Sequence, residues 1–180
     1  MFPALPSRLV AMDDALRLYG TASAAVALLL RERDGLEILV MERATRETDP
    51  WSGHWSFPGG RRRGDEPLLD AVCRETQEEV GLSPRRGDLI GCLPARAPAN
   101  RPALLVLPFV FRWADGASGP HGPEVVSTAW VPLAALPASR TTMTIHLHGR
   151  EVSVPAFVRA PWGIWGFTYR LLEDLLAVLQ

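Results

Sequence analysis

The stretch from Asp65 to Gly81 most constrains the fold of this chain. Apolar side chains recur there at the spacing of an amphipathic helix, with one face formed by Leu69, Val72, Cys73, Thr76 and Val80. Asp65 can cap the first turn, and Gly81 stands where a left-handed C-terminal cap is expected. A helix with one apolar face needs a second layer to pack against, so this segment predicts a layered fold.

Short apolar segments on both sides of this helix predict the second layer, a β-sheet. We expect strands at 21–31, 36–43, 88–93, 103–113, 125–131, 143–148 and 151–157. We also expect helical pieces within an N-terminal arm, in a short turn and at the end of the chain: 1–20, 132–136 and 164–179. The predicted fold class is α/β (α+β), with helices on a central mixed sheet, in a single domain spanning 1–180.

Composition excludes several classes of protein. With 180 residues, 47% of them hydrophobic, the chain suits a folded domain rather than a disordered segment. Its basic residues are all arginine and nearly balance the acidic ones, giving a formal net charge of −1, so we expect no nucleic-acid partner and no membrane partner. Cys73 and Cys92 are too few for a disulfide framework, and neither a secretion signal nor a bilayer-length apolar run is evident. The sequence therefore predicts a cytoplasmic protein.

Three glutamates on the predicted helix indicate where chemistry could occur. Glu75, Glu78 and Glu79 are spaced i, i+3 and i+4, which puts like charges on one face and destabilises a helix by roughly 0.2–0.5 kcal/mol per pair. A cation would offset the repulsion, and carboxylate oxygens suit Mg²⁺ or Mn²⁺. Such a triad alone is more often a solvated face. The preceding segment 57–60, which could be an ordinary tight turn, contains two glycines that allow close backbone approach to a ligand, and the combination favours a metal site.

The segment 60–82, GRRRGDEPLLDAVCRETQEEVGL, resembles the Nudix box. The fixed positions of that box are present at its spacing: Gly60, Glu66, Arg74, Glu75, Glu78, Glu79 and Gly81. Thr76 is the one departure, in an apolar slot where its branched methyl can still pack. The resemblance implies a Nudix-type α/β/α sandwich, with a loop and helix at 59–82. It also implies a Mg²⁺- or Mn²⁺-dependent pyrophosphohydrolase that acts on nucleoside-diphosphate derivatives.

The resemblance also implies roles for individual residues. The implied metal ligands are Gly59 through its carbonyl, Glu66 in a supporting position, Glu75, Glu78 and Glu79. Arg74 would orient the neighbouring glutamates by charge-assisted hydrogen bonds. Glu124, on a later loop, would be the general base, with Glu78 as the alternative base and a merely solvated Glu124 also open. Glu66 could instead stabilise the helix through its dipole.

Two further stretches, 39–43 with 53–60 and 162–168, resemble the coenzyme A pyrophosphatase branch of this family, and we expect the second to open the last helix. That branch splits coenzyme A or its thioesters into phosphopantetheine and adenosine bisphosphate. Asp49 stands where the branch has an arginine, although Arg46 is near, so ADP-ribose, a nucleotide sugar or a dinucleotide remains the alternative substrate. The implied substrate-binding residues are Arg43, Arg46, Trp55, Gly60 and Arg61.

Other features leave alternatives open. Four tryptophans could either stack a purine or pack in the core: Trp51, Trp55, Trp162 and Trp165. A homodimer that exchanges the N-terminal arm is one further expectation. A noncatalytic nucleotide-binding module is the competing functional class, although it would predict loss of the box glutamates, which are all present.

Overall fold

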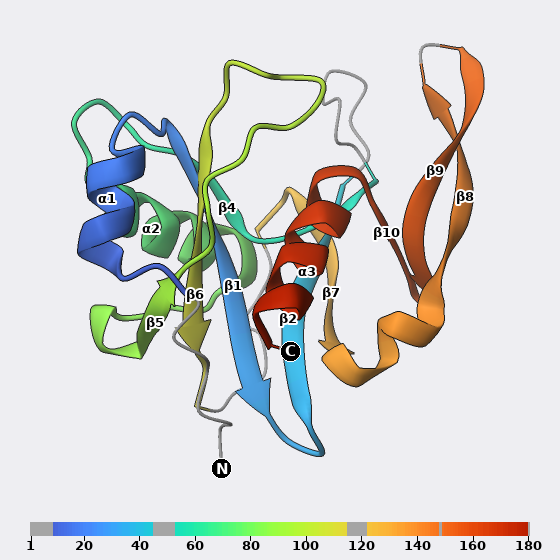
Figure 1. The fold of residues 1–180 in the computed structure, drawn as a ribbon, viewed down its shortest axis with the longest axis horizontal. Helices are drawn as coiled ribbons and strands as arrows, with labels where there is room; N and C mark the ends of the chain where they lie inside the picture. Colours follow the sequence, from blue (N-terminus) through green and yellow to red (C-terminus); the bar gives the residue numbers. More distant parts are fainter. Residues whose placement is uncertain (1–8, 45–52, 115–121, 148, 180) are drawn as a thin grey trace.

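A mixed β-sheet forms the centre of the protein (Figure 1). The structure is a computed structural model that describes residues 9–44, 53–114, 122–147 and 149–179. Within these ranges seven strands join in one sheet, in the order β3-β2-β1-β6-β5, with β4 added to β1 and β7 added to β2. Its strands are β1 (Ala24–Glu32), β2 (Leu36–Arg43), β3 (Trp55–Ser56), β4 (Gly59–Arg61), β5 (Leu89–Cys92), β6 (Val106–Arg112) and β7 (Val125–Pro132). The β1–β6 pair is parallel and the other pairs are antiparallel, so the sheet is mixed as predicted.

Helices cover both faces of this sheet. They are α1 (Met12–Tyr19), α2 (Leu68–Val80) and α3 (Gly166–Leu179). Figure 1 shows α1 and α2 grouped together, away from α3. The buried side chains of α1 and α2 belong to one hydrophobic cluster and those of α3 to another, which gives the expected α/β/α layers. Among the described residues no helix is long and apolar enough to cross a bilayer.

The first seven residues of β1 are all apolar, rather than alternating between apolar and polar, because both faces of this strand are covered. Ala25, Ala27 and Leu29 face the cluster with α1 and α2, whereas Leu28 and Leu30 face the cluster with α3. All five side chains are fully buried. A strand covered on both faces needs apolar residues at every position, and this places β1 at the centre of the molecule.

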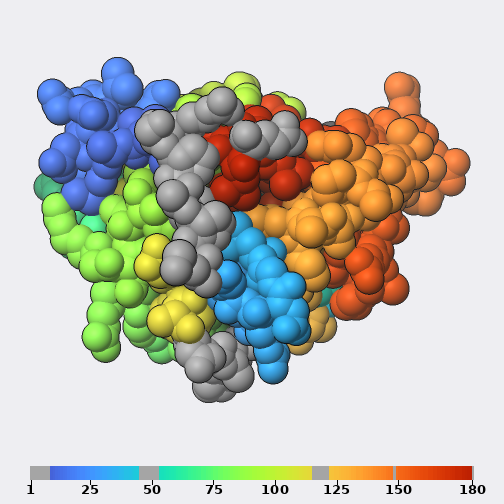
Figure 2. Space-filling model, turned by 60° about the horizontal axis from the view of Figure 1, so that its bottom comes forward, coloured from blue at the N-terminus to red at the C-terminus, as the bar shows by residue number. Residues whose placement is uncertain are grey.

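A second sheet projects from the side of the first. It contains β8 (Arg140–Leu147), β9 (Arg150–Arg159) and β10 (Trp162–Trp165), in the order β10-β9-β8. The β8–β9 hairpin, coloured orange, reaches outward in both Figure 1 and Figure 2. The described residues also contain three short 3-10 helices: η1 (Arg86–Asp88), η2 (Leu133–Ala135) and η3 (Pro137–Ser139).

The predicted elements are largely confirmed, although the strands expected to begin at 21, 103 and 143 begin at Ala24, Val106 and Arg140, and the starts of two helices were wrong. The last helix was expected to begin at Ile164, yet Trp162–Trp165 forms β10 on β9, and the helix starts at Gly166, which has a φ of +64°. The helix of the box begins at Leu68 rather than after Asp65, because Pro67 occupies the N-cap and no described side chain caps it. Gly81 does cap its C-terminus, with a φ of +68° and its N–H bonded to the Gln77 carbonyl at 3.1 Å. The two short strands β3 and β4 were not predicted.

Candidate functional site

Helix α2 packs its buried face against β1 and β4, and this packing sets its distance from the sheet. The predicted apolar face is confirmed at Leu69, Val72, Thr76 and Val80, which are buried, while Cys73 is only half-buried. The Thr76 hydroxyl donates to the Val72 carbonyl at 2.7 Å, so its polar atom has a partner within the helix. Threonine therefore fits the apolar slot without leaving an unsatisfied buried group.

Two glycines in β4 allow this strand to lie close to both β1 and α2. Gly59 has a φ of +148°, and a Cβ there would come within 2.3 Å of the Ala25 carbonyl oxygen. A Cβ on Gly60 would come within 2.7 Å of the Glu75 Cδ. The neighbouring backbone thus requires glycine at Gly59, whereas a Cβ on Gly60 would meet the movable end of the Glu75 side chain.

Glu79 points from α2 into the protein and is only 6% exposed. The Gly59 N–H donates to its Oε2 at 2.8 Å, and Arg43 Nη1 lies 3.5 Å from its Oε1. Burial raises the pKa of Glu79 to about 8, opposed by the Gly59 amide and Arg43 and reinforced by the carboxylates of Glu75 and Glu124. A buried carboxylate among other carboxylates is stabilised by any cation placed beside it.

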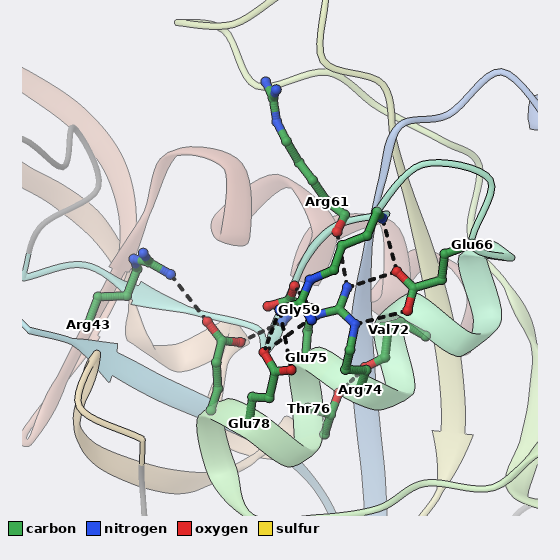
Figure 3. Close-up of polar contacts among 11 residues, drawn as sticks. Arg43, Gly59, Arg61, Glu66, Val72, Arg74, Glu75, Thr76 and Glu78 are labelled. Atoms are coloured by element: carbon green, nitrogen blue, oxygen red, sulfur yellow. Dashed lines mark hydrogen bonds and ion pairs between the residues drawn. The ribbon is translucent and has the colours of Figure 1, made fainter.

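Arg74 gathers the other acidic side chains of the site (Figure 3). Its Nε and Nη2 each lie 2.9 Å from one carboxylate oxygen of Glu66, and its Nη1 lies 2.6 Å from Glu75 and 3.4 Å from Glu78. The Arg74 hydrogen bond, followed by the Arg63 backbone N–H, lowers the pKa of Glu66 to about 2. The hydrogen bonds to Glu66 and Glu75 also raise the pKa of Arg74, against the effect of desolvation. These contacts are the ones expected of a residue that orients the glutamates.

The three helix glutamates differ in environment, which their spacing alone did not predict. Glu79 is buried, Glu75 is held by Arg74, and Glu78 is half-exposed with Arg63 Nη2 at 3.3 Å. Arginines therefore offset the like-charge repulsion. In the described part of the chain no three His, Cys, Asp or Glu side chains converge as a ready set of metal ligands. The Arg63–Glu78 contact was not predicted, although the arginine run after Gly60 was a signal for it.

Glu124 comes to this site from the loop before β7. Its Oε2 lies 3.9 Å from Arg43 Nη2, and its side chain is 47% exposed. Because Arg43 also contacts Glu79, one guanidinium links the box helix to the later loop. The structure thus brings the predicted base to the carboxylate cluster.

The predicted substrate-binding residues fall in different places. Arg43 and Gly60 lie at the carboxylates, as described above. Arg61 is exposed, and Figure 3 shows its side chain directed away from the glutamates while its carbonyl accepts a 3.3 Å hydrogen bond from Arg74. Trp55 is only 7% exposed and packs in the core, so its ring offers a ligand little surface. Arg46 lies outside the described residues.

The remaining tryptophans divide in the same way. Trp162 is buried in the core cluster that contains Trp55. Trp165 is half-buried, and its ring meets His54 edge to face with centroids 4.2 Å apart. Trp51 lies outside the described residues. Core packing therefore accounts for Trp55 and Trp162 without a ligand.

Comparison with known proteins supports the family resemblance. Residues 20–148 match the model of the NUDIX domain. The human mitochondrial coenzyme A diphosphatase NUDT8 is 31% identical over 165 residues, covering 88% of this chain and 70% of that protein. An uncharacterised Schizosaccharomyces pombe protein is 36% identical over 124 residues, covering 60% of this chain, which spans only 36% of that protein's length. The similarity to NUDT8 confirms the predicted resemblance to the coenzyme A branch.

Solved structures show the same fold. The NUDIX domain of Shewanella oneidensis NrtR, in a cocrystal structure with ADP ribose, superimposes with a TM-score of 0.57 at 17% identity, and 88% of each chain is covered. The family match covers more than half of this chain, and includes β4, helix α2 and the loop that carries Glu124. The chain therefore belongs to the NUDIX family and is a Nudix hydrolase.

Proposed function

We propose that this chain uses Mg²⁺, or Mn²⁺ in its place, to cleave the diphosphate linkage of coenzyme A or a coenzyme A thioester. The products would be a phosphopantetheine portion and adenosine bisphosphate. The Glu79 carboxylate carries the proposal, because burial raises its pKa to about 8 and the nearby Glu75 and Glu124 carboxylates add to the rise, against the Gly59 amide and Arg43. A divalent cation would relieve that repulsion and favour the ionised form.

By chemical type, the donors at this site fit a hard divalent cation. Carboxylate and carbonyl oxygens are the ligands that Mg²⁺ prefers, and Mg²⁺ commonly keeps waters and substrate phosphate oxygens in addition. The residues that would hold it are Gly59 through its carbonyl, Glu75, Glu78 and Glu79, with Glu66 in support. When bound, the ion supplies positive charge to the diphosphate oxygens and makes a bound water more acidic.

The protein's own residues would position and deprotonate the attacking water. Arg74 fixes Glu66 with two of its N–H groups and holds Glu75 with a third, which limits the motion of both carboxylates. Arg43 keeps Glu124 beside Glu79. The water oxygen would attack one phosphorus, the bridging P–O bond would break with its electron pair on the leaving phosphate, and Glu124 would accept the water proton.

Glu78 is the alternative proton acceptor at this site. In the structure it carries the contact from Arg63 and a weaker one from Arg74. Contact with two guanidiniums gives Glu78 a role in the charge balance of the arginine–glutamate cluster. We therefore propose Glu124 as the base.

Similarity to the human coenzyme A diphosphatase over 88% of the chain supports coenzyme A as the substrate. Asp49 in place of the arginine of that branch keeps ADP-ribose, nucleotide sugars and dinucleotides as alternatives. All of these contain a diphosphate or longer phosphoanhydride linkage. The carboxylate cluster could act on any of them.

Two free thiols support a reducing compartment. Cys92 is fully buried, and burial raises its pKa to about 12; burial, followed by Asp70 and Asp88, also raises the pKa of Cys73. We propose the cytoplasm as the location of this chain; the human relative is a mitochondrial protein. The expected homodimer is a separate proposal, to be tested by light scattering of the purified chain.

The function is tested by parallel turnover assays of coenzyme A, acetyl-coenzyme A, ADP-ribose, a nucleotide sugar and diadenosine tetraphosphate, with Mg²⁺ and with EDTA. We expect the highest kcat/KM for a coenzyme A compound, products of the mass of phosphopantetheine and adenosine bisphosphate, and no turnover in EDTA. Glu79→Gln should lower kcat by about 100-fold or more, since it removes a charge at the reacting centre. Glu151→Gln, on the exposed β8–β9 hairpin, is the matched control and should retain parental turnover.

A large preference for ADP-ribose would reject coenzyme A and leave the hydrolase intact. Parental turnover by Glu79→Gln would reject the site itself. Turnover that persists undiminished in EDTA would reject the divalent metal.

A further inference from the structure

Gly122, outside the Nudix box, lies against the last turn of α2. Its N–H donates to the Glu79 carbonyl at 3.0 Å. A Cβ on Gly122 would lie 2.4 Å from the Glu78 carbonyl oxygen and 3.6 Å from the Glu79 Cα. The last carbonyls of a helix lack partners within the helix, so Gly122 satisfies one of them from a separate loop.

The same loop is held at two further points. The Gly122 carbonyl accepts the Val125 N–H at 3.0 Å, closing a tight turn around Pro123 and Glu124. The Glu124 carbonyl accepts the Ala44 N–H at 2.8 Å, just beyond the end of β2. The main chain of Glu124 is thus fixed between helix α2 and strand β2.

This anchoring directs the Glu124 side chain to the site. Its carboxylate lies 3.9 Å from Arg43, whose other nitrogen is 3.5 Å from the Glu79 carboxylate. The backbone of Glu79 contacts Gly122, and its side chain contacts Arg43. Glu79 is therefore linked to the loop at two points. Its carbonyl accepts the Gly122 N–H, and its carboxylate contacts Arg43, which also contacts the Glu124 carboxylate.

We infer that Gly122 is a positioning residue of the hydrolytic site. Because it has no side chain, its backbone can contact the last turn of α2, and this contact sets the distance between Glu124 and the carboxylates of the Nudix box. The inference rests on the proposed function, in which Glu124 accepts the water proton. The atoms that a Cβ would meet are helix backbone and cannot rotate aside, so the loop must move outward. A shift on the order of 1 Å at a reacting group can cost about 100-fold in rate.

A double-mutant cycle separates positioning from a merely structural role. Gly122→Ala should lower kcat by about 10- to 100-fold and change KM by less than about 3-fold. In a Glu124→Gln background the same change should lower kcat by less than about 2-fold, because the side chain that it displaces has already lost its function. Gly87→Ala is the matched control, since a Cβ at Gly87 meets nothing within 4 Å, and it should retain parental kcat.

An equal decrease in kcat in the two backgrounds would show that Gly122 supports only the fold, and would overturn the inference. Parental kcat for Gly122→Ala would overturn it as well. If Gly122→Ala does not fold by circular dichroism, Pro123→Gly replaces it. That change keeps the contact of Gly122 with α2 and loosens only the backbone between Gly122 and Glu124. We therefore expect kcat to fall in the parent background and to stay unchanged in the Glu124→Gln background. A parent enzyme that hydrolyses none of the diphosphates would instead remove the proposed function, and the inference with it.

Discussion

Arg74 and Glu66 form a two-point ion pair in which each carboxylate oxygen receives one guanidinium N–H at 2.9 Å. Glu66 precedes α2 and Arg74 lies in its middle, so the pair joins the entering loop to the helix. The third contact of Arg74, to Glu75 at 2.6 Å, extends this rigidity to a proposed metal ligand. Lysine cannot reproduce the arrangement, because its ammonium lacks a planar fork of donors.

Arg74→Lys should therefore weaken the site while the fold is retained. We expect the Mg²⁺ concentration for half-maximal activity to rise by about 10- to 100-fold, as for other residues that orient metal ligands. The measurement is a Mg²⁺ titration of turnover. Arg96→Lys is the matched control, since Arg96 makes a similar two-point pair with Asp174 on α3, on the other side of the sheet. Equal titration curves for parent and Arg74→Lys would contradict the role.

The two glycines of β4 should respond differently to alanine. Gly59→Ala would place a Cβ against the β1 backbone in a left-handed conformation, and should lower the free energy of unfolding by about 1–3 kcal/mol or more. Gly60→Ala would meet the movable end of the Glu75 side chain, so stability should change by less than about 1 kcal/mol while kcat falls on the order of 10-fold. Urea unfolding and turnover are measured for both variants. A fully active, stable Gly60→Ala would show that the position of Glu75 is unimportant.

Stability in metal-free buffer should depend on pH through Glu79. Its pKa is about 8 in the folded protein against an ordinary value of 4.5, so between these values the folded state holds more protons than the unfolded state. The free energy of unfolding should therefore fall as pH rises from about 5 to 8, by at most roughly 5 kcal/mol. The measurement is urea unfolding in EDTA across this range, as the difference between parent and Glu79→Gln. A difference that does not change with pH would contradict the raised pKa.

Thr76 should depend on its methyl group more than on its hydroxyl. Thr76→Val removes the hydrogen bond to the Val72 carbonyl, which keeps its helical N–H partner, so stability should change by less than about 1 kcal/mol. Thr76→Ser keeps the hydroxyl and removes a buried methyl, at a cost of about 1 kcal/mol or more. Thermal unfolding of the two variants measures the order. Greater loss in Thr76→Val would show that the hydroxyl has the larger role.

Local pattern was enough to predict most elements of the fold. The box helix and the long strands carry periodic or continuous apolar residues, and Gly81 marks a helix end in sequence as it does in the structure. The strand at Trp162–Trp165 was predicted as helix because Ile164 continues the apolar spacing of α3. Its pairing with β9 is a tertiary contact, and the only local signals against a helix were Pro161 and the nearby glycines.

The site was predictable in its residues but not in their environments. The spacing of Glu75 and Glu79 places both on α2, yet it does not show that the Gly59 N–H of β4 reaches Glu79 or that Glu79 is the more deeply buried of the two. That difference depends on the pairing of β4 with β1, a contact between residues more than thirty positions apart. The Arg63 contact with Glu78 and the Gly122 contact with α2 depend on loop paths that no periodicity describes.

Ala25 and Ala27, small residues of β1 beneath the box helix, have a consequence for how this enzyme can vary. Both lie in the buried cluster that α2 joins, so their size limits how closely α2 approaches the sheet. That distance in turn determines the 2.8 Å hydrogen bond from the Gly59 N–H to the Glu79 carboxylate. A larger side chain at either position would lift the helix and separate the two, although neither alanine touches a phosphate. Both alanines must therefore stay small for the Gly59–Glu79 contact to persist, whichever compound the enzyme recognises.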